Sequence, residues 1–126
     1  MIQDRSLVVV ADNSGAKIGR IFKIPGSSKK RYAEIGEEVV LSVQVAEPRK
    51  AVKKKEVLRA VVVRQRKPFR RADGSYIRFD ENAVVILDVS GKDKKEPKAG
   101  RIFGPIPREL QELGYQTIIS RAPEVV

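Results

Sequence analysis

Short apolar runs of strand length, each closed by a cluster of turn-forming residues, constrain this chain more than any other feature of its sequence. Val, Ile and Leu dominate five runs, with Asn, Asp, Gly, Ser and Pro gathered between them; the runs occupy residues 6–11, 16–24, 37–46, 57–64 and 83–89. Short strands at such spacing predict a β-sandwich or a small β-barrel. A chain of 126 residues with no internal repeat or linker is expected to form one domain, residues 1–126.

Helical periodicity appears only near the C-terminal end. In the stretch PRELQELG, Pro107 suits the first helical position, Leu110 and Leu113 share one face, and Gly114 ends the pattern. This pattern allows about two turns of helix at most, and we expect a short helical region at about residues 105–114. The charged stretch at 90–100 offers no apolar anchor and is the most disorder-prone insert of the chain.

The composition argues against several classes of function. The chain has no Cys and no His, which removes disulfides, thiolate chemistry, the commonest general base and the commonest transition-metal ligand. We therefore expect neither an enzyme nor a metal site. No apolar run approaches the ~20 residues that a membrane-spanning helix needs. The first residues, MIQDRSLVVV, resemble neither a signal peptide nor a transit peptide.

The positive charge of the chain is concentrated in one segment. The formal net charge is +10, and residues 49–71 hold eleven Lys or Arg but a single acid, Glu56. Elsewhere, cations and acids balance. Charge placed only for solubility has no need to gather in this way, whereas a focused basic patch is typical of a protein that binds a polyanion. Nucleic acid is the favoured partner, and a solvated basic face is the alternative.

The most basic part of this segment is predicted to form a protruding β-ribbon at about residues 64–80. Asp73-Gly74 between strand-like residues is a strong hairpin signal, and Pro68 excludes this stretch from a central sheet position. On the returning arm Tyr76 and Arg78 share one face, while Phe79 lies on the other with Ile77. Phe69 and Tyr76 are candidates for stacking on bases, and Phe79 is expected to cover the apolar side of the ribbon.

Three motifs with a superficial likeness to catalytic or ligand-binding sequences are better explained otherwise. The trio Asp12-Asn13-Ser14 lacks a base that would activate the hydroxyl and suits a turn. The stretch at 26–30 lacks the first glycine and the spacing of a phosphate-binding loop. Lysines interrupt the acids at 88–96, which opposes calcium binding.

Six blocks of the sequence resemble one known family over nearly the whole chain, in register. They are VADNSGAK at 10–17, RYAEIGE at 31–37, VLRAVVVR at 57–64, RRADGSYIRFDENA at 70–83, RIFGPIPREL at 101–110 and APEVV at 122–126. The family is that of large-ribosomal-subunit protein fourteen, in its bacterial type.

This resemblance implies a mainly β fold: a five-stranded small β-barrel, of OB or SH3-like kind, with a protruding β-ribbon and short C-terminal helices. It also implies a non-enzymatic structural constituent of the large ribosomal subunit that binds large-subunit rRNA and bridges to small-subunit rRNA. The implied partners are large-subunit proteins nineteen and three and the ribosome-silencing factor. No cofactor is implied. The implied location is a cytoplasmic ribosome, with an organelle ribosome as an alternative.

The resemblance also implies two groups of site residues. The first group binds rRNA or a protein neighbour, with Arg49 and Lys50 also facing the small subunit; its members are Lys17, Lys29, Lys30, Arg31, Arg49, Lys50, Lys53, Lys54, Arg64, Arg66, Lys67, Arg70, Arg71 and Arg78. The second group forms the intersubunit-bridge and silencing-factor surface and consists of Arg101, Thr117, Ser120 and Arg121.

The chain departs from the family pattern at several positions. Gly100 stands where the family often has Thr, and Thr117 replaces a frequent Lys. Arg121 replaces a usual apolar residue and is able to restore the cation lost at Thr117. Lys55 stands at a common Gly position, and 92–98 is more charged than usual. Most of these changes fall on the bridge and silencing-factor surface.

A second class of function is a free barrel that binds single-stranded nucleic acid outside the ribosome. Such barrels carry several aromatic side chains on one exposed strand face. Aromatic residues make up only 6% of this chain and are dispersed, which counts against that alternative. Tight binding to random oligonucleotides without ribosomes would favour it.

Overall fold

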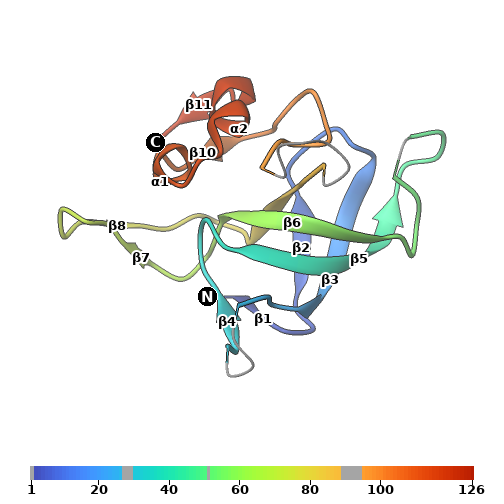
Figure 1. Ribbon diagram of the computed structural model, residues 1–126, viewed down its shortest axis with the longest axis horizontal. Helices are drawn as coiled ribbons and strands as arrows, with labels where there is room; N and C mark the ends of the chain where they lie inside the picture. Colours follow the sequence, from blue (N-terminus) through green and yellow to red (C-terminus); the bar gives the residue numbers. More distant parts are fainter. Residues whose placement is uncertain (1, 27–29, 51, 89–94) are drawn as a thin grey trace.

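A computed structural model describes residues 2–26, 30–50, 52–88 and 95–126 of the chain (Figure 1). Five strands form a closed barrel in the order β2-β3-β5-β6-β9, which confirms the expected fold class. Their bounds are β2 Leu7–Val10, β3 Ala16–Lys23, β5 Glu38–Ala46, β6 Val57–Arg64 and β9 Ala83–Ile86. Neighbouring strands are antiparallel except β2 and β9, whose parallel pairing closes the barrel. Of the two architectures that the strand pattern allows, the barrel is therefore correct.

Alternation of side chains in the strands fills the barrel interior. On β5, Val39, Leu41 and Val43 point inward and are fully buried, as a period-two pattern predicts. Val45, which continues the same alternation, is exposed because the strand pairs irregularly with β3 near its end. Ile21 from β3 and Ile86 from β9 complete this first core.

A second core lies outside the barrel wall. Val61 and Val63 of β6 and Val85 of β9 point away from the barrel interior and pack against Leu110 and Ile118 of the C-terminal region. Strands β6 and β9 are thus buried on both faces, which explains why their sequences are nearly continuous apolar runs. The C-terminal region is thereby fixed onto one side of the barrel.

The C-terminal region contains more structure than its sequence pattern predicts. Helix α1 spans Glu109–Glu112 within the expected stretch, and a second helix, α2, spans Gln116–Arg121. Two short strands, β10 Pro105–Ile106 and β11 Glu124–Val125, pair in parallel. In the described part of the charged stretch, Pro97 is buried and pairs with Leu87, which anchors this end of the stretch to the barrel. Residues 89–94 lie outside the described residues.

The ribbon projects from one end of β6, and the loop that joins β5 to β6 projects from the other (Figure 1). Strands β7 Phe69–Arg70 and β8 Tyr76–Ile77 pair antiparallel, with Arg70 opposite Tyr76. The predicted turn is confirmed: the amide of Gly74 donates to the carbonyl of Arg71 at 3.0 Å. Phe69 and Phe79 both pack against the barrel core, so Phe69 is not available as the predicted stacking platform.

Two further short strands pair at the lower edge of the barrel in Figure 1: β1 Ile2–Gln3 and β4 Tyr32–Ala33. Ile2 and Ala33 are buried and contribute to the barrel core. None of the helices among the described residues has the length and apolar character that crossing a bilayer requires.

Candidate nucleic-acid interface

Three segments that are distant in the sequence meet at one side of the barrel: the turn at 12–15, the β5–β6 loop at 47–56 and the segment at 101–103. The amide of Glu47 donates to the carbonyl of Gly15 at 2.7 Å, which fixes the loop to the turn. The amide of Phe103 donates to the carbonyl of Ala11 at 2.8 Å, which fixes the third segment beside them. Asn13 and Arg101 add a reciprocal pair of hydrogen bonds.

Gly15 permits the close approach of the loop to the turn. Its φ of +109° lies in a region that glycine tolerates, and a Cβ atom there would stand 2.3 Å from the Cβ of Lys50. No larger residue fits this contact without displacing the backbone of the loop. Lys50 is therefore held at a defined place on the surface.

The buried side chain of Asp12 stabilises the turn at which these three segments meet. Its side chain is 4% exposed, and one carboxylate oxygen accepts both the amide and the hydroxyl of Ser14, at 3.0 and 2.6 Å. The other oxygen accepts the amide of Ile86 at 3.0 Å. Burial raises the pKa of Asp12, and these hydrogen bonds oppose the rise. Because Ser14 is buried as well, the pair is a structural turn, as predicted, and not an accessible nucleophile.

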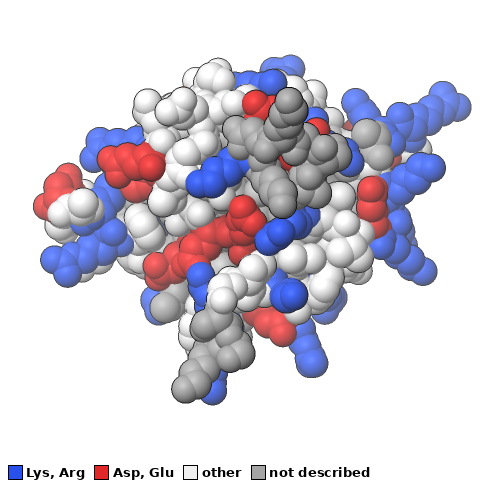
Figure 2. All heavy atoms as spheres, in the orientation of Figure 1, with Lys and Arg blue, Asp and Glu red and all other residues white. Residues whose placement is uncertain are grey.

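The first cationic surface, which we call the loop patch, covers this side of the molecule. All of its side chains are exposed, and they extend from the β5–β6 loop and the start of β3: Lys17, Arg49, Lys50, Lys53 and Lys54. Lys17 lies 3.8 Å from Glu47, a loose surface pair. Figure 2 shows Lys and Arg side chains projecting into solvent at this end of the molecule.

The second cationic surface, the ribbon patch, lies at the opposite end of the long axis (Figure 2). Its members are exposed: Arg66, Lys67, Arg70 and Arg78. Tyr76 is 66% exposed and lies opposite Arg70, so an aromatic face is available beside these cations. On the face shown in Figure 2, acidic side chains and a few Lys and Arg side chains lie between these two ends.

Arg64, which the resemblance assigns to rRNA anchoring, is not on the surface. It is 5% exposed, and one guanidinium nitrogen donates to the carbonyls of Phe103 and Pro105 at 2.9 and 3.0 Å. A second nitrogen pairs with Glu81 at 3.1 Å. Gly104 leaves room for it, since a Cβ atom there would stand 2.8 Å from the guanidinium. We therefore assign Arg64 to holding the segment at 103–105 against the barrel.

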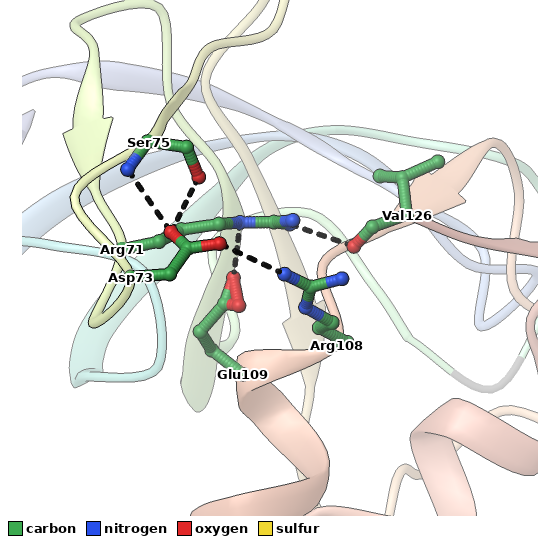
Figure 3. Close-up of polar contacts among 6 residues, drawn as sticks. All are labelled: Arg71, Asp73, Ser75, Arg108, Glu109 and Val126. Carbon is green, nitrogen blue, oxygen red and sulfur yellow. Dashed lines mark hydrogen bonds and ion pairs between the residues drawn. The ribbon is translucent and has the colours of Figure 1, made fainter.

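Arg71 is also engaged within the molecule (Figure 3). Its Nε lies 2.9 Å from a carboxylate oxygen of Glu109 in α1, and its Nη2 donates to the carbonyl of Val126 at 2.7 Å. The Nε–Glu109 contact is an ion pair without hydrogen-bond alignment, which leaves both atoms without a directed partner. Arg108 reaches back to Asp73 at 3.8 Å. The ribbon tip is thus tied to the C-terminal region, and Glu109 supplies the anion that balances part of its charge.

The predicted bridge surface occupies the C-terminal region and the segment before β10. Arg101 is exposed, with its guanidinium 5.7 Å from the ring centre of Phe103. Ser120 donates to the carbonyl of Thr117 at 2.8 Å, within the same helix. Arg121 donates to the carbonyl of Ala99 at 2.9 Å, so this departure from the family pattern links α2 to the segment that precedes Arg101.

Two of the remaining predicted residues, Lys30 and Arg31, directly precede β4. Arg31 is exposed, and Lys30 forms an ion pair with Glu37. Lys29 lies outside the described residues. Sequence reasoning did not identify Phe103, Asp12 and Glu109 as residues that organise the interface. The turn signal at 12–15 indicated a structural role for Asp12. The contacts of Phe103 and Glu109 join residues far apart in the chain, so no local signal indicated them.

Comparison with known protein families agrees with this arrangement. The model of the family described as ribosomal protein L14p/L23e matches residues 1–126, the whole length of the chain. This family implies a structural, typically non-enzymatic, protein of the large ribosomal subunit. The closed barrel, the two cationic surfaces and the full-length match together lead to one conclusion: the chain belongs to the ribosomal protein L14p/L23e family.

Proposed function

We propose that the protein binds large-subunit rRNA through the loop patch and the ribbon patch and contributes to bridges with small-subunit rRNA. The observation that carries this proposal is the set of five exposed cations of the loop patch, four of them on a loop whose backbone is fixed to the turn at 12–15 and the fifth, Lys17, on β3. Cations on a fixed support neutralise phosphates without first ordering the loop, and the counterions that they release favour binding.

The separation of the two patches supports a protein that contacts RNA at more than one place. The loop patch and the ribbon patch lie at opposite ends of β6, with acids between them (Figure 2). A flat anionic surface such as a membrane would meet only one of these ends at a time. A folded RNA that surrounds the protein meets both.

The bridging role is proposed for Arg101, Thr117, Ser120 and Arg121, together with Arg49 and Lys50. The bond from Arg121 to Ala99 and the bonds between Asn13 and Arg101 connect these residues into one surface. The same surface is proposed to receive the ribosome-silencing factor. The cation of Arg121 replaces the one that the family often has at position 117.

Large-subunit proteins nineteen and three are the proposed protein neighbours. The open edges of the two-stranded ribbon β7–β8 support the docking of a protein strand. The ribosome that contains this protein is proposed to be cytoplasmic, with an organelle ribosome as the alternative.

The experiment measures the affinity of purified protein for large-subunit rRNA as a function of salt. Lys53 and Lys54 are replaced together by Gln, as are Arg66 and Arg70. Each double variant should lower the slope of log affinity against log salt by about 1.4 to 1.8, since each phosphate contact contributes about 0.7 to 0.9.

The matched control removes the same charge elsewhere, at the exposed Arg20 and Lys23 of β3. Its slope should stay close to that of the wild type. Equal slopes for all three double variants would reject the localised interface. A protein that never sediments with large subunits from a low-salt lysate would reject the ribosomal role altogether.

A further inference from the structure

The meeting point of the three segments encloses a hollow with a volume of about 430 Å³ beside the loop patch. This volume lies within the ~300–1,000 Å³ of pockets that bind small ligands. Its apolar side is formed by Val9, Ala16 and Phe103, and its rim carries Lys17 and Lys50. The hollow therefore combines an apolar wall with two cations, and its lining also includes the exposed acid Glu47 and the buried Asp12.

Phe103 is the distinctive member of this wall. The residue is 45% exposed although its amide is bonded to Ala11, so the backbone is fixed while the side chain remains accessible, with the guanidinium of Arg101 5.7 Å from the ring centre. Val9 is also exposed on the outer side of β2. An accessible aromatic ring on a fixed backbone is a suitable platform for a planar ligand, because little conformational freedom is lost on binding.

The rim is equally well fixed. The Cβ of Lys50 packs closely against Gly15, which defines where this side chain leaves the backbone, and Lys17 projects from the start of β3. The carboxylate of Glu47 lies 3.8 Å from the ammonium of Lys17 and balances part of its charge. Lys50 is therefore the better of the two cations for binding a negative group. The wall thus favours a flat apolar surface, and Lys50 favours an anion attached to that surface.

We propose that this hollow binds one unpaired nucleotide of an RNA, with its base against Phe103 and its phosphate at Lys50. The inference rests on the proposed role in RNA binding and adds a specific site to it. A nucleotide is the ligand that joins a flat aromatic group to an anion. The bases of a continuous duplex are stacked on one another and do not present a free face, so the site selects a bulged, looped or terminal nucleotide.

The experiment compares two RNA hairpins that share one compact loop, in which the bases stack on one another and leave no free face, and that differ only in the stem: one stem is fully paired and the other has a single bulged nucleotide. Each is titrated with the full-length protein at a fixed salt concentration. The wild type should bind the bulged hairpin about tenfold more tightly, since stacking of one base on an aromatic side chain contributes about 1–3 kcal/mol and tenfold corresponds to about 1.4 kcal/mol. Phe103→Ala should abolish the preference while leaving binding of the paired hairpin unchanged.

The control is Phe22→Ala, which removes an aromatic ring of similar exposure, 47%, that does not line the hollow. It should retain the preference for the bulge. Lys50→Gln should weaken binding of both hairpins and lower the salt slope by about one phosphate contact. Thermal unfolding of each variant verifies that it is folded, and Phe103→Leu, which keeps an apolar side chain, replaces Phe103→Ala if the latter unfolds.

The outcomes separate this inference from the proposed function. A wild type that binds both hairpins equally, with a steep salt dependence, would reject the nucleotide site and leave general RNA binding intact. The same rejection follows if Phe103→Ala keeps the preference. A wild type that binds neither hairpin nor large-subunit rRNA would reject the proposed function itself.

Discussion

The ribbon and the β5–β6 loop are both rich in Arg and Lys, but the fold uses their charges in different ways. In and beside the ribbon, Arg64 is buried against three oxygen acceptors and Arg71 is paired with Glu109. In the loop, backbone bonds such as that from Glu47 to Gly15 hold the chain, and the cationic side chains extend into solvent. The ribbon region thus uses part of its positive charge in contacts within the protein, whereas the β5–β6 loop exposes its cations to solvent, where a partner can bind them.

This difference shows that the number of cations in a segment overstates the charge that it offers to a ligand. Arg64 and Arg71 belong to the same basic segment as Arg66 and Arg70, and the sequence alone does not distinguish them. What distinguishes them is whether a carbonyl or a carboxylate from the C-terminal region lies within reach. Substitution of engaged and exposed cations should therefore separate effects on stability from effects on RNA affinity.

The largest expected effect is that of Arg64→Met. The substitution leaves the carbonyls of Phe103 and Pro105 without their donor, and each unsatisfied buried group costs roughly 1–3 kcal/mol. We expect the free energy of unfolding to fall by about 3 kcal/mol in denaturant titrations. Arg66→Met, the matched change at an exposed cation, should alter it by less than about 0.5 kcal/mol. Similar losses in both variants would show that Arg64 is not an internal support.

Asp12→Asn tests the support of the loop patch in the same way. The amide has a single acceptor oxygen, whereas Asp12 uses one oxygen for Ser14 and the other for Ile86. We expect the free energy of unfolding to fall by about 2 kcal/mol, because one buried donor loses its acceptor. Asp73→Asn provides the control. Asp73 also accepts a bond from a backbone amide, that of Ser75, but it is exposed, so this change should lower the free energy of unfolding much less.

The pH dependence of this loss has a definite sign. Burial raises the pKa of Asp12 above its unfolded value of 3.8, so its contribution to stability is greatest below that value and is lost as the pH rises through the folded-state pKa. The difference in unfolding free energy between wild type and Asp12→Asn should therefore be larger at about pH 4 than at about pH 7. A difference that grows with pH would contradict the assigned cause.

Arg71→Gln and Arg70→Gln compare an engaged cation with an exposed neighbour. Arg71→Gln removes the contacts with Glu109 and Val126 and should lower the free energy of unfolding by about 1–2 kcal/mol, without changing the salt slope of RNA binding. Arg70→Gln should leave stability within about 0.5 kcal/mol and lower the slope by about 0.7–0.9. A lower slope for Arg71→Gln would mean that RNA replaces Glu109 as its partner.

Much of the fold could be predicted from the sequence because the signals were local. β-Branched runs and turn clusters placed four barrel strands within one residue at each end and the start of β9 at the correct residue, although the run at 83–89 extends three residues past the end of β9, and Asp73-Gly74 placed the tip of the ribbon. The family resemblance implied short C-terminal helices, which is confirmed, but local periodicity did not show helix α2 because its sequence, QTIISR, is rich in β-branched residues with modest helix propensity. Burial of Ile118 in the second core stabilises it, and that contact is not local.

The interface was less predictable because its organisation depends on contacts across the chain. Arg64 meets acceptors about forty positions later, and Asp12 meets an amide seventy-four positions away. No window of sequence shows that the first is buried or that the second supports the 47–56 loop. The location of charge was a local property and was predicted, whereas its availability was a property of the fold.

The smallest expected effect concerns the backbone of the loop itself, at Lys55. Its φ of +69° lies in the left-handed region, where a side chain costs about 1 kcal/mol and Gly costs almost nothing. Gly also gains freedom in the unfolded chain, which offsets part of this relief, so Lys55→Gly should raise the free energy of unfolding by about 0.5 kcal/mol or less.

Lys54→Gly removes the same charge from the adjacent position, which does not have a positive φ. This variant only increases the conformational freedom of the unfolded chain, so its free energy of unfolding should fall by about 0.5–1 kcal/mol. The two variants should thus differ by about 1 kcal/mol in denaturant titrations and agree in net charge. If they are equally stable, the left-handed conformation at Lys55 carries no strain; if they differ as expected, the chain keeps Lys55 at a small cost in stability, as a sixth cation beside the loop patch.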